Sequence, residues 1–313
     1  MIVARSLKDV TRDANSVVTV GTFDGVHLAH REIIREVVNR AKTREGRSAL
    51  ITFEPHPKEV VLSKRGPVKL LSTIDERIEL IGAMNVDLLL VVEFTKAFSR
   101  IGAREFYEKY IVNGTGVDEV VVGYDHMFGR DREAGIDELV HIGKEFGFSV
   151  FAVHPFTIEG EAVSSTRIRS ALGSGDIQRA RQLLGRPYEI SGRVVRGDGR
   201  GAQIGFPTAN LEPLSSSKVV PARGVYAVGA RVGAEVFSGM MNIGVRPTIA
   251  KDGAESLEVH LFDFERDIYG QVLTVTFLRR LRPERAFASV PELVAQLERD
   301  RAEALQTVRE HSR

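Results

Sequence analysis

The 313-residue chain is long enough for two domains of ordinary size, and its 43% hydrophobic and 27% charged residues indicate a water-soluble globular protein. Because 43 Lys and Arg balance 42 Asp and Glu to a formal net charge of +1, no overall field attracts nucleic acid or an anionic membrane. The absence of cysteine excludes disulfides, thiolate nucleophiles and thiolate metal sites. Neither a signal-peptide core nor an apolar run of about 18 residues occurs, so we expect a cytoplasmic protein without membrane contact.

Strand-like and helix-like segments alternate in the first half of the chain. Short apolar runs predict strands, and the runs between them have the amphipathic pattern of helices. Because this alternation is typical of a parallel sheet covered on both faces, we predict a Rossmann-like α/β domain. The predicted strands are residues 16–22, 49–53, 87–92, 119–122 and 149–153, and the predicted helices are residues 29–44, 73–84, 103–111 and 136–146.

From Tyr188 onward the pattern changes, because strand-like runs follow one another without helical runs between them. Several runs alternate apolar and polar residues, as residues 257–261 do. Such alternation is typical of antiparallel sheets, so we predict an antiparallel β-barrel. Its predicted strands are residues 188–195, 224–232, 236–243, 256–262 and 272–278.

The change of pattern places a domain boundary near Pro187, which predicts domains of residues 1–186 and 187–313. A short helix over residues 176–184 is predicted just before this boundary. A terminal amphipathic helix is predicted to begin at a capping box, residues 289–292. Its buried face is predicted to contain Leu293, Leu297, Ala304, Leu305 and Val308.

The segment GTFDGVHLAH, residues 21–30, joins the first predicted strand to the first predicted helix. Gly21 and Gly25 allow the backbone to approach a ligand closely. His27 and His30 are three residues apart, so both can project from one face of a first helical turn, where free N–H groups favour an anion. By spacing alone, a phosphate site and a plain turn with two surface histidines are equally consistent with this segment.

Three further motifs follow predicted strands, at the edge where parallel sheets bind ligands. EPHP, residues 54–57, is a loop stiffened by two prolines that holds His56, and the alternative is a rigid turn with a solvated histidine. GYDHMFGR, residues 123–130, places the carboxylate of Asp125 just after a strand, and the alternative to a ligand contact is a turn that caps the sheet. SSTRIR, residues 164–169, combines capping hydroxyls with arginines that can bind phosphate, and the alternative is an ordinary serine cap.

The second half contains GDGRGAQIGFPTAN, residues 197–210. It formally fits the G-x-G-x-x-A dinucleotide fingerprint, but we predict no helix after it, because Gly205 and Pro207 intervene. What remains is a glycine-rich flap that leads into the PTAN segment, residues 207–210. A Gly- and Pro-rich loop with an Asx turn is the structural alternative.

FDGVHLAH is similar to the FDGVHxGH signature of nucleotidyltransferases, and the motifs together, in their order, resemble the bacterial bifunctional riboflavin kinase/FAD synthetase family. The resemblance implies an FMN adenylyltransferase in the N-terminal domain, with His27 and His30 as catalytic residues. The flavin would contact His56 and Pro57. The implied ATP and phosphate ligands are Gly21, Phe23, Asp24, Gly25, Asp125, Ser164, Ser165, Thr166 and Arg169.

GFPTAN resembles the corresponding motif of riboflavin kinases, which implies a kinase in the C-terminal domain. Glu258 matches the family's catalytic base, which takes a proton from the riboflavin 5′-hydroxyl. Thr208 and Asn210 would organise Mg²⁺ and phosphate. The flap over the ATP phosphates would include Gly197, Gly199, Gly201 and Gly205.

The resemblance implies two reactions that use ATP and Mg²⁺: riboflavin is phosphorylated to FMN, and FMN is then adenylylated to FAD. The chain departs from the family pattern at Ala29, where glycine is usual, at His126, where phenylalanine is usual, and at Ala286, where lysine is usual. Three hypotheses therefore stand: a bifunctional enzyme, a riboflavin kinase with a weakened adenylyltransferase site, and a non-catalytic flavin- or nucleotide-binding regulator. The oligomeric state is not predicted.

Overall fold

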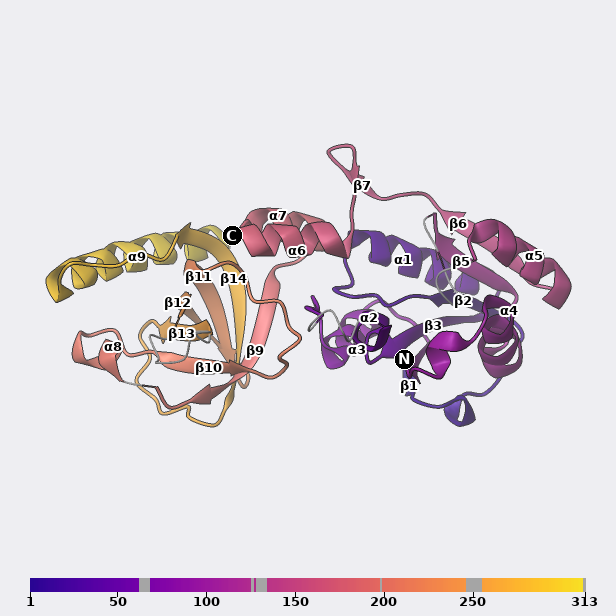
Figure 1. Ribbon diagram of the computed structural model, residues 1–313, viewed down its shortest axis with the longest axis horizontal. Helices are drawn as coiled ribbons and strands as arrows, with labels where there is room; N and C mark the ends of the chain where they lie inside the picture. Colours follow the sequence, from indigo (N-terminus) through magenta and orange to yellow (C-terminus); the bar gives the residue numbers. More distant parts are fainter. Residues whose placement is uncertain (62–67, 125–126, 128–133, 198, 246–254, 312–313) are drawn as a thin grey trace. The chain divides into compact units, whose positions relative to one another are not determined.

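The computed structural model describes residues 1–61, 68–124, 127, 134–197, 199–245 and 255–311. By its internal contacts the chain divides into two compact units, Met1–Ser165 and Thr166–Arg313. Figure 1 shows a helix-covered sheet in the first unit and a barrel in the second. No helix in the described part of the chain combines the length and the apolar character needed to cross a membrane.

The first unit contains, within its described residues, a six-stranded sheet in the order β1-β4-β3-β2-β5-β6. Every pairing in it is parallel. The chain runs outward from β2 through β3 to β4 and then returns to β5 on the other side of β2, so the strand order reverses between β2 and β5. Ligands bind at such a switch point, outside the carboxyl ends of the strands. The strands are β1 (Ile2–Ala4), β2 (Ser16–Val20), β3 (Arg47–Glu54), β4 (Leu88–Glu93), β5 (Glu119–Gly123) and β6 (Ser149–Val153).

Apolar residues alternate between the two faces of this sheet, and helices cover both. Val17 and Leu50 face one side, where they pack with Ile34 of α1. Their neighbours Val18 and Ile51 face the other side and pack with residues of α4, η4 and α5. The predicted doubly covered parallel sheet is therefore confirmed. The described helices are η1 (Leu7–Asp9), α1 (Leu28–Thr43), α2 (Pro57–Val61), α3 (Ile74–Gly82), η3 (Phe98–Arg100), α4 (Ala103–Phe106), η4 (Tyr107–Thr115) and α5 (Ile136–Phe146), and β7 (Thr157–Ile158) pairs with β8 (Glu161–Ala162).

The second unit contains a closed antiparallel barrel in the order β10-β13-β12-β11-β14-β9, over the residues that the structure describes. The predicted antiparallel barrel is confirmed, and β10 is a strand that the sequence pattern did not predict. The strands are β9 (Tyr188–Val195), β10 (Ala209–Pro213), β11 (Gly224–Val232), β12 (Glu235–Val245), β13 (Glu255–Leu261) and β14 (Val272–Arg282), and the helices are α6 (Ser165–Ser174), α7 (Ile177–Leu184), α8 (Arg200–Gln203) and α9 (Val290–His311).

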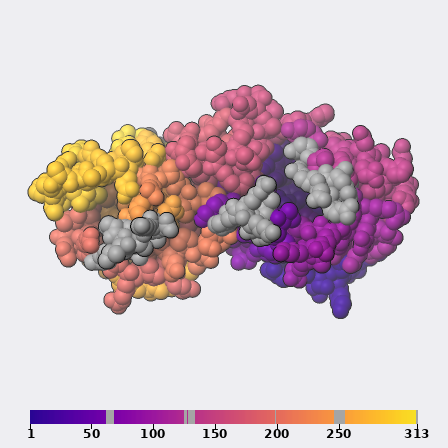
Figure 2. Space-filling view, viewed as in Figure 1, coloured from indigo at the N-terminus to yellow at the C-terminus, as the bar shows by residue number. Residues whose placement is uncertain are grey.

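The predicted terminal helix is present as α9, which packs against the barrel, and Figure 2 shows it in yellow at the surface. Ala304 packs with Phe206 and Met240, and Leu297 and Leu305 are partly buried against the same cluster. A buried Asp300, which the apolar pattern could not predict, accepts three hydrogen bonds of 2.8–3.0 Å from Arg282 of β14. The helix is thus held by both apolar contacts and a buried ion pair.

Helices α6 and α7 belong by contact to the barrel unit. The amide of Ala222 donates to the carbonyl of Leu172 in α6 at 2.9 Å, and Arg280 of β14 donates to the carbonyl of Ser174 at 3.2 Å. The division by contacts therefore falls after Ser165, whereas the predicted domains meet between residues 186 and 187. As a boundary between functional domains, the position near Pro187 stays a prediction.

Candidate active sites

The loop after β2 is a tight turn at the switch point of the parallel sheet. Phe23 and Val26 have positive φ angles of 47° and 39°, and the amide of Val26 donates to the carbonyl of Phe23 at 2.9 Å. A positive φ is strained for a β-branched residue, and such strain is concentrated at functional loops. Gly25, at φ 83°, occupies the position in the turn where a side chain would add further strain.

The side chains of Phe23 and Asp24 point into the protein, and their role as nucleotide ligands stays a prediction. The Phe23 side chain is 2% exposed and belongs to the core beneath the loop. The Asp24 carboxylate is also 2% exposed and accepts hydrogen bonds from the amides of Leu71 at 2.9 Å and Ser72 at 3.0 Å. The Gly25 amide donates to the Ser72 hydroxyl at 2.8 Å. These hydrogen bonds fix the conformation of the loop.

His27 and His30 lie together at the start of α1, as the spacing predicts. His27 is the N-cap residue, and its Nδ1 accepts the His30 amide at 3.4 Å. The two rings stack with centroids 3.6 Å apart, and the Phe23 ring meets His30 edge-on at 5.4 Å. His27 is buried and His30 packs against the core residue Phe23, so the interpretation as surface histidines is wrong.

Burial, and to a smaller extent the neighbouring His27, hold the pKa of His30 well below its ordinary value. His30 is therefore a neutral imidazole at neutral pH. Its Nδ1 is inaccessible and has no hydrogen-bond partner. The two rings lie at the positive end of a 16-residue helix, where an anionic ligand is favoured.

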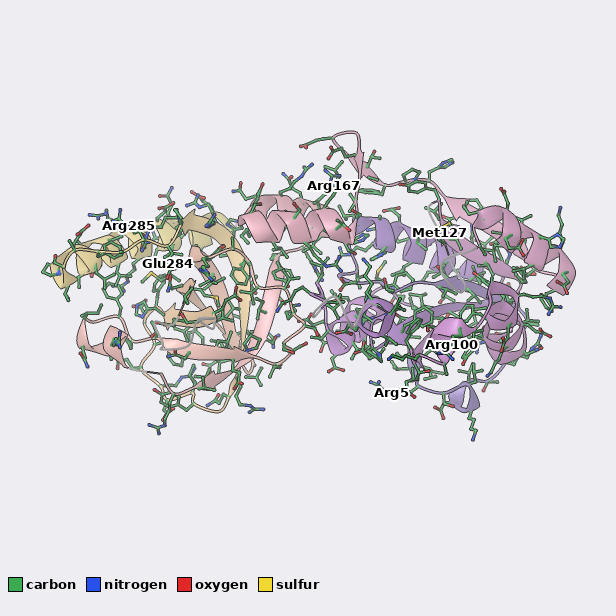
Figure 3. All side chains as sticks on the ribbon, in the orientation of Figure 1. Arg5, Arg100, Met127, Arg167, Glu284 and Arg285 are labelled. Atoms are coloured by element: carbon green, nitrogen blue, oxygen red, sulfur yellow. The ribbon has the colours of Figure 1, made fainter. Side chains whose placement is uncertain are left out.

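The second nucleotide motif meets the first through Ser165, the first residue of α6. Its hydroxyl donates to the carbonyl of Asp24 at 3.0 Å, which joins segments 141 residues apart. Thr166 and Arg169 belong to the second compact unit, in the helix where Figure 3 labels Arg167, so their approach to the histidines stays a prediction. Ser164 precedes this helix. Asp125 and His126 lie outside the described residues.

The EPHP loop after β3 buries its histidine. His56 is 4% exposed, its amide donates to the Glu59 carboxylate at 3.0 Å, and its Nδ1 accepts the Lys58 amide at 3.1 Å. A solvated histidine is therefore excluded. The accepted hydrogen bond places the ring proton of a neutral His56 on Nε2, and Pro57 is the first residue of α2.

Three polar side chains form a row across adjacent strands of the barrel. Asn210 of β10 and Asn242 of β12 are both register partners of Glu258, which lies on β13 between them. Side chains directly opposite each other in antiparallel strands share a face, with Cβ atoms about 4.5–5.5 Å apart. The structure therefore brings the predicted base and the predicted Asn210 together, and it adds Asn242, which the sequence contained as an isolated amide between apolar strand residues.

The glycine flap closes against this row. A Cβ atom on Gly197 would collide with the Asn210 side chain, so only glycine leaves room for that amide. Gly205 has a φ of 83°, which also favours glycine. Between them lies α8, a one-turn helix of four residues. This helix ends at Gln203, before Gly205, and is too short to complete a dinucleotide fold.

His260 fixes the segment that carries Thr208. Its Nδ1 lies 2.7 Å from the carbonyl of Pro207, and because a carbonyl only accepts, this nitrogen carries the proton. Burial lowers the pKa of His260, and the rings of Phe206 and Phe262 pack against it at 5.2 and 5.6 Å. A neutral imidazole thus holds the PTAN motif to β13, two residues from Glu258.

A cavity of about 280 Å³ opens beside Thr208. Val259, Leu261 and Ile268 give it an apolar wall, and the aromatic ring of Tyr269 and the charged Arg266 complete it. Small-molecule sites combine such apolar walls with a few polar groups. The cavity is large enough to hold a planar heterocyclic ring next to the predicted phosphate ligands.

Two family models match the chain: FAD synthetase over residues 9–167 and riboflavin kinase over residues 184–308. Similar curated proteins include the bifunctional riboflavin kinase/FMN adenylyltransferases of Listeria monocytogenes, 38% identical over 93% of this chain and 92% of the relative, and of Pseudomonas fluorescens, 39% identical over 92% and 91%. The chain belongs to this family. The relative from Escherichia coli is 38% identical over 91% of this chain and 90% of its own length.

A crystal structure described as a macrolide-efflux protein from Streptococcus pneumoniae matches 96% of this chain and 97% of its own, with a TM-score of 0.86 and 33% identity. That description concerns the other protein. The likeness extends over both units and supports the fold of the whole chain.

The RPERAF segment, the last motif to resemble the riboflavin kinase family, lies between β14 and α9, where Figure 3 labels Glu284 and Arg285. A Cβ atom on Gly244 would collide with the Glu284 carboxylate and lie 3.2 Å from the Asn242 amide nitrogen. The Glu284 carboxylate therefore lies against Gly244, near the Asn242 side chain. Sequence reasoning missed this contact, because the residues are 40 or more positions apart.

Proposed function

We propose that the chain carries both activities of its family on separate domains. The barrel would phosphorylate riboflavin to FMN, and the N-terminal domain, residues 1–186, would adenylylate FMN to FAD. The observation that carries the proposal is the placement of Glu258 directly opposite Asn210, beside the glycine flap. A carboxylate in this row can act as a base next to a phosphate site, whereas a binding protein has no need of one.

In the kinase reaction Glu258 takes the proton of the riboflavin 5′-hydroxyl. The hydroxyl oxygen then forms a bond to the γ-phosphorus of ATP, and the bond from that phosphorus to the β,γ-bridging oxygen breaks to release ADP. Positioning and charge stabilisation supply most of the rate in phosphoryl transfer. The flap holds the phosphates, and His260 keeps the Thr208 segment in place through the Pro207 carbonyl.

Magnesium fits the donors of the barrel site. Among the described residues, no group of three or more His, Asp or Glu side chains could hold a metal ion. The hydroxyl of Thr208 and the amide of Asn210 are neutral oxygen donors, which suit a Mg²⁺ ion that takes most of its ligands from phosphate and water. When bound, the ion would neutralise the developing charge on the phosphates.

In the adenylyltransferase reaction a phosphate oxygen of FMN bonds to the α-phosphorus of ATP, and pyrophosphate leaves. No covalent enzyme intermediate is required. His27 and His30 would stabilise the charged phosphates with ring N–H donors at the start of α1, and Ser165, Thr166 and Arg169 would complete the site. Such preorganised donors contribute about 10²–10³ each to turnover in other enzymes.

Incubation of the purified protein with riboflavin, ATP and Mg²⁺, followed by chromatography of the flavins, tests the proposal. We expect FMN to form first and FAD to follow. FMN without FAD would favour a kinase with a weakened adenylyltransferase site, for which Ala29 is the candidate cause, and an Ala29→Gly variant should then restore FAD formation. No product at all would favour a non-catalytic binding protein. The expected cytoplasmic location stays a prediction.

A further inference from the structure

Arg77 of α3 is the largest of the fully buried side chains among the described residues, with 1% of its surface exposed. Burial of a guanidinium group is costly unless its charge and its N–H donors are satisfied. Nothing in the helical pattern of α3 requires a charged residue at a buried position. The location therefore calls for an explanation in terms of what the guanidinium contacts.

The Arg77 guanidinium bonds to groups just before two separate loops, at the start of the loop after β2 and at the end of β3. Nη1 donates to the carbonyls of Thr22 at 3.0 Å and Phe53 at 3.2 Å. Nη2 donates to the Glu54 carboxylate at 2.6 Å, which forms an ion pair. Nε reaches the Thr73 carbonyl of its own helix at 3.4 Å. The planar guanidinium group therefore donates to several acceptors at once. A compact point charge could not bond to all of them with the same geometry.

The two loops are those that carry the predicted adenylyltransferase residues. Thr22 opens the loop that leads to His27 and His30, and Phe53 and Glu54 end β3 just before the EPHP loop. The two strands are adjacent and parallel, so their carboxyl ends meet at one edge of the sheet. The Asp24 carboxylate ties the same first loop to the amides of Leu71 and Ser72, just before α3.

We propose that Arg77 is a positioning residue for FMN adenylylation, which fixes the histidine loop relative to the flavin loop. The inference rests on the proposed function. Because Arg77 is buried, it acts through the carbonyls of Thr22 and Phe53 and touches no substrate. Its loss should let the two loops shift against each other, which affects the geometry of reaction more than the number of substrate contacts.

The test compares Arg77→Met with a matched control, Arg47→Met. Arg47 lies at the opposite end of β3 and also donates to two carbonyls of distant segments, Thr11 and Thr115, both at 2.6 Å. Both variants lose an arginine that ties strands together, but only Arg77 faces the loops. For Arg77→Met we expect kcat for FAD formation from supplied FMN to fall about 10–100-fold, since small misplacements have such effects, with KM for ATP and FMN within about threefold.

In the same preparations, riboflavin phosphorylation should stay within about twofold, and Arg47→Met should keep native FAD formation despite a comparable loss of thermal stability. Arg77→Lys, which keeps the charge beside Glu54, should fold and give an intermediate kcat. If Arg77→Met does not fold, the kcat of Arg77→Lys tests the inference in its place.

Equal losses of kcat in Arg77→Met and Arg47→Met, or native kcat in Arg77→Lys and Arg77→Met, would overturn the inference. Absence of FAD formation by the native protein would instead refute the proposed function, and this inference with it.

Discussion

At the scale of single residues, Glu258 combines a half-buried position with two amide neighbours, Asn210 and Asn242, on the flanking strands. Glu258→Gln keeps the size of this side chain and removes its ability to accept a proton. We expect FMN formation to fall about 10²–10⁴-fold, the range typical of a lost general base. FAD formation from supplied FMN should stay within about twofold. Both rates are measured by chromatography of the flavins.

The control for this change is Glu255→Gln, at the exposed start of the same strand. It should leave both rates unchanged. If Glu258→Gln retained FMN formation, the base would have to be sought elsewhere, and Glu284 beside Asn242 would be the next candidate.

His30 provides a second residue-scale prediction, because burial and the nearby His27 keep its pKa well below 6.5 in the folded protein. In the unfolded chain it takes up a proton near pH 6.5. Acid therefore favours the unfolded state: the stability is fully present above pH 6.5 and is lost as the pH falls through that value toward the folded pKa. One such group changes the free energy of unfolding by at most about 1.4 kcal/mol per pH unit.

Thermal unfolding at pH 7.5 and 5.5 measures this effect. The native protein should lose more stability between the two values than His30→Gln does. His141→Gln, on an exposed position of α5, is the matched histidine replacement and should behave as the native protein. An equal pH dependence in the native protein and His30→Gln would show that another group is responsible.

At the scale of elements, the attachment of α9 depends on Asp300, which is 2% exposed, and on its partner Arg282. Gln296 adds a hydrogen bond of 2.7 Å to the same carboxylate. Asp300→Ala leaves the guanidinium without its carboxylate, and we expect the free energy of unfolding of the barrel to fall by about 3 kcal/mol. Urea unfolding of the barrel unit measures this loss of free energy.

The control is Glu303→Ala on the same helix. Glu303 pairs with Arg279 at 3.5 Å on the exposed side, where an ion pair contributes about 0–1 kcal/mol. A similar small loss for both variants would mean that apolar contacts of Ala304 and Leu305 alone hold the helix.

At the scale of the whole molecule, the parts that the sequence predicted are those set by local periodicity. Continuous apolar runs predicted the parallel strands, because those strands are buried on both faces. Alternating runs predicted most of the barrel strands, because those strands are buried on one face. The strand β10 was missed because it is short and begins within a turn-like motif after Pro207.

The contacts that the sequence could not predict are those between distant segments. The Asp24 carboxylate was assigned to a nucleotide, yet its partners are amides 47 and 48 residues away. Arg77 and Asp300 are charged residues in amphipathic helices, and only their partners on other elements explain their burial. Motif position therefore predicted where both sites lie, while the contacts of individual side chains required the fold.

The two activities are proposed for separate domains, so each should survive inactivation of the other. Neither His30→Ala nor Glu258→Gln alone should convert riboflavin to FAD, because each variant lacks one step. An equimolar mixture of the two proteins should form FAD from riboflavin after a lag, in which FMN made by His30→Ala is released and then adenylylated by Glu258→Gln. The lag should shorten when FMN is supplied at the start, because the second step then no longer waits for the first.

A mixture that makes FMN but never FAD, while Glu258→Gln alone adenylylates added FMN, would mean that FMN does not leave the barrel of one molecule for another. A mixture without either product would mean that both sites must be intact in one chain, which would contradict the assignment of one activity to each domain.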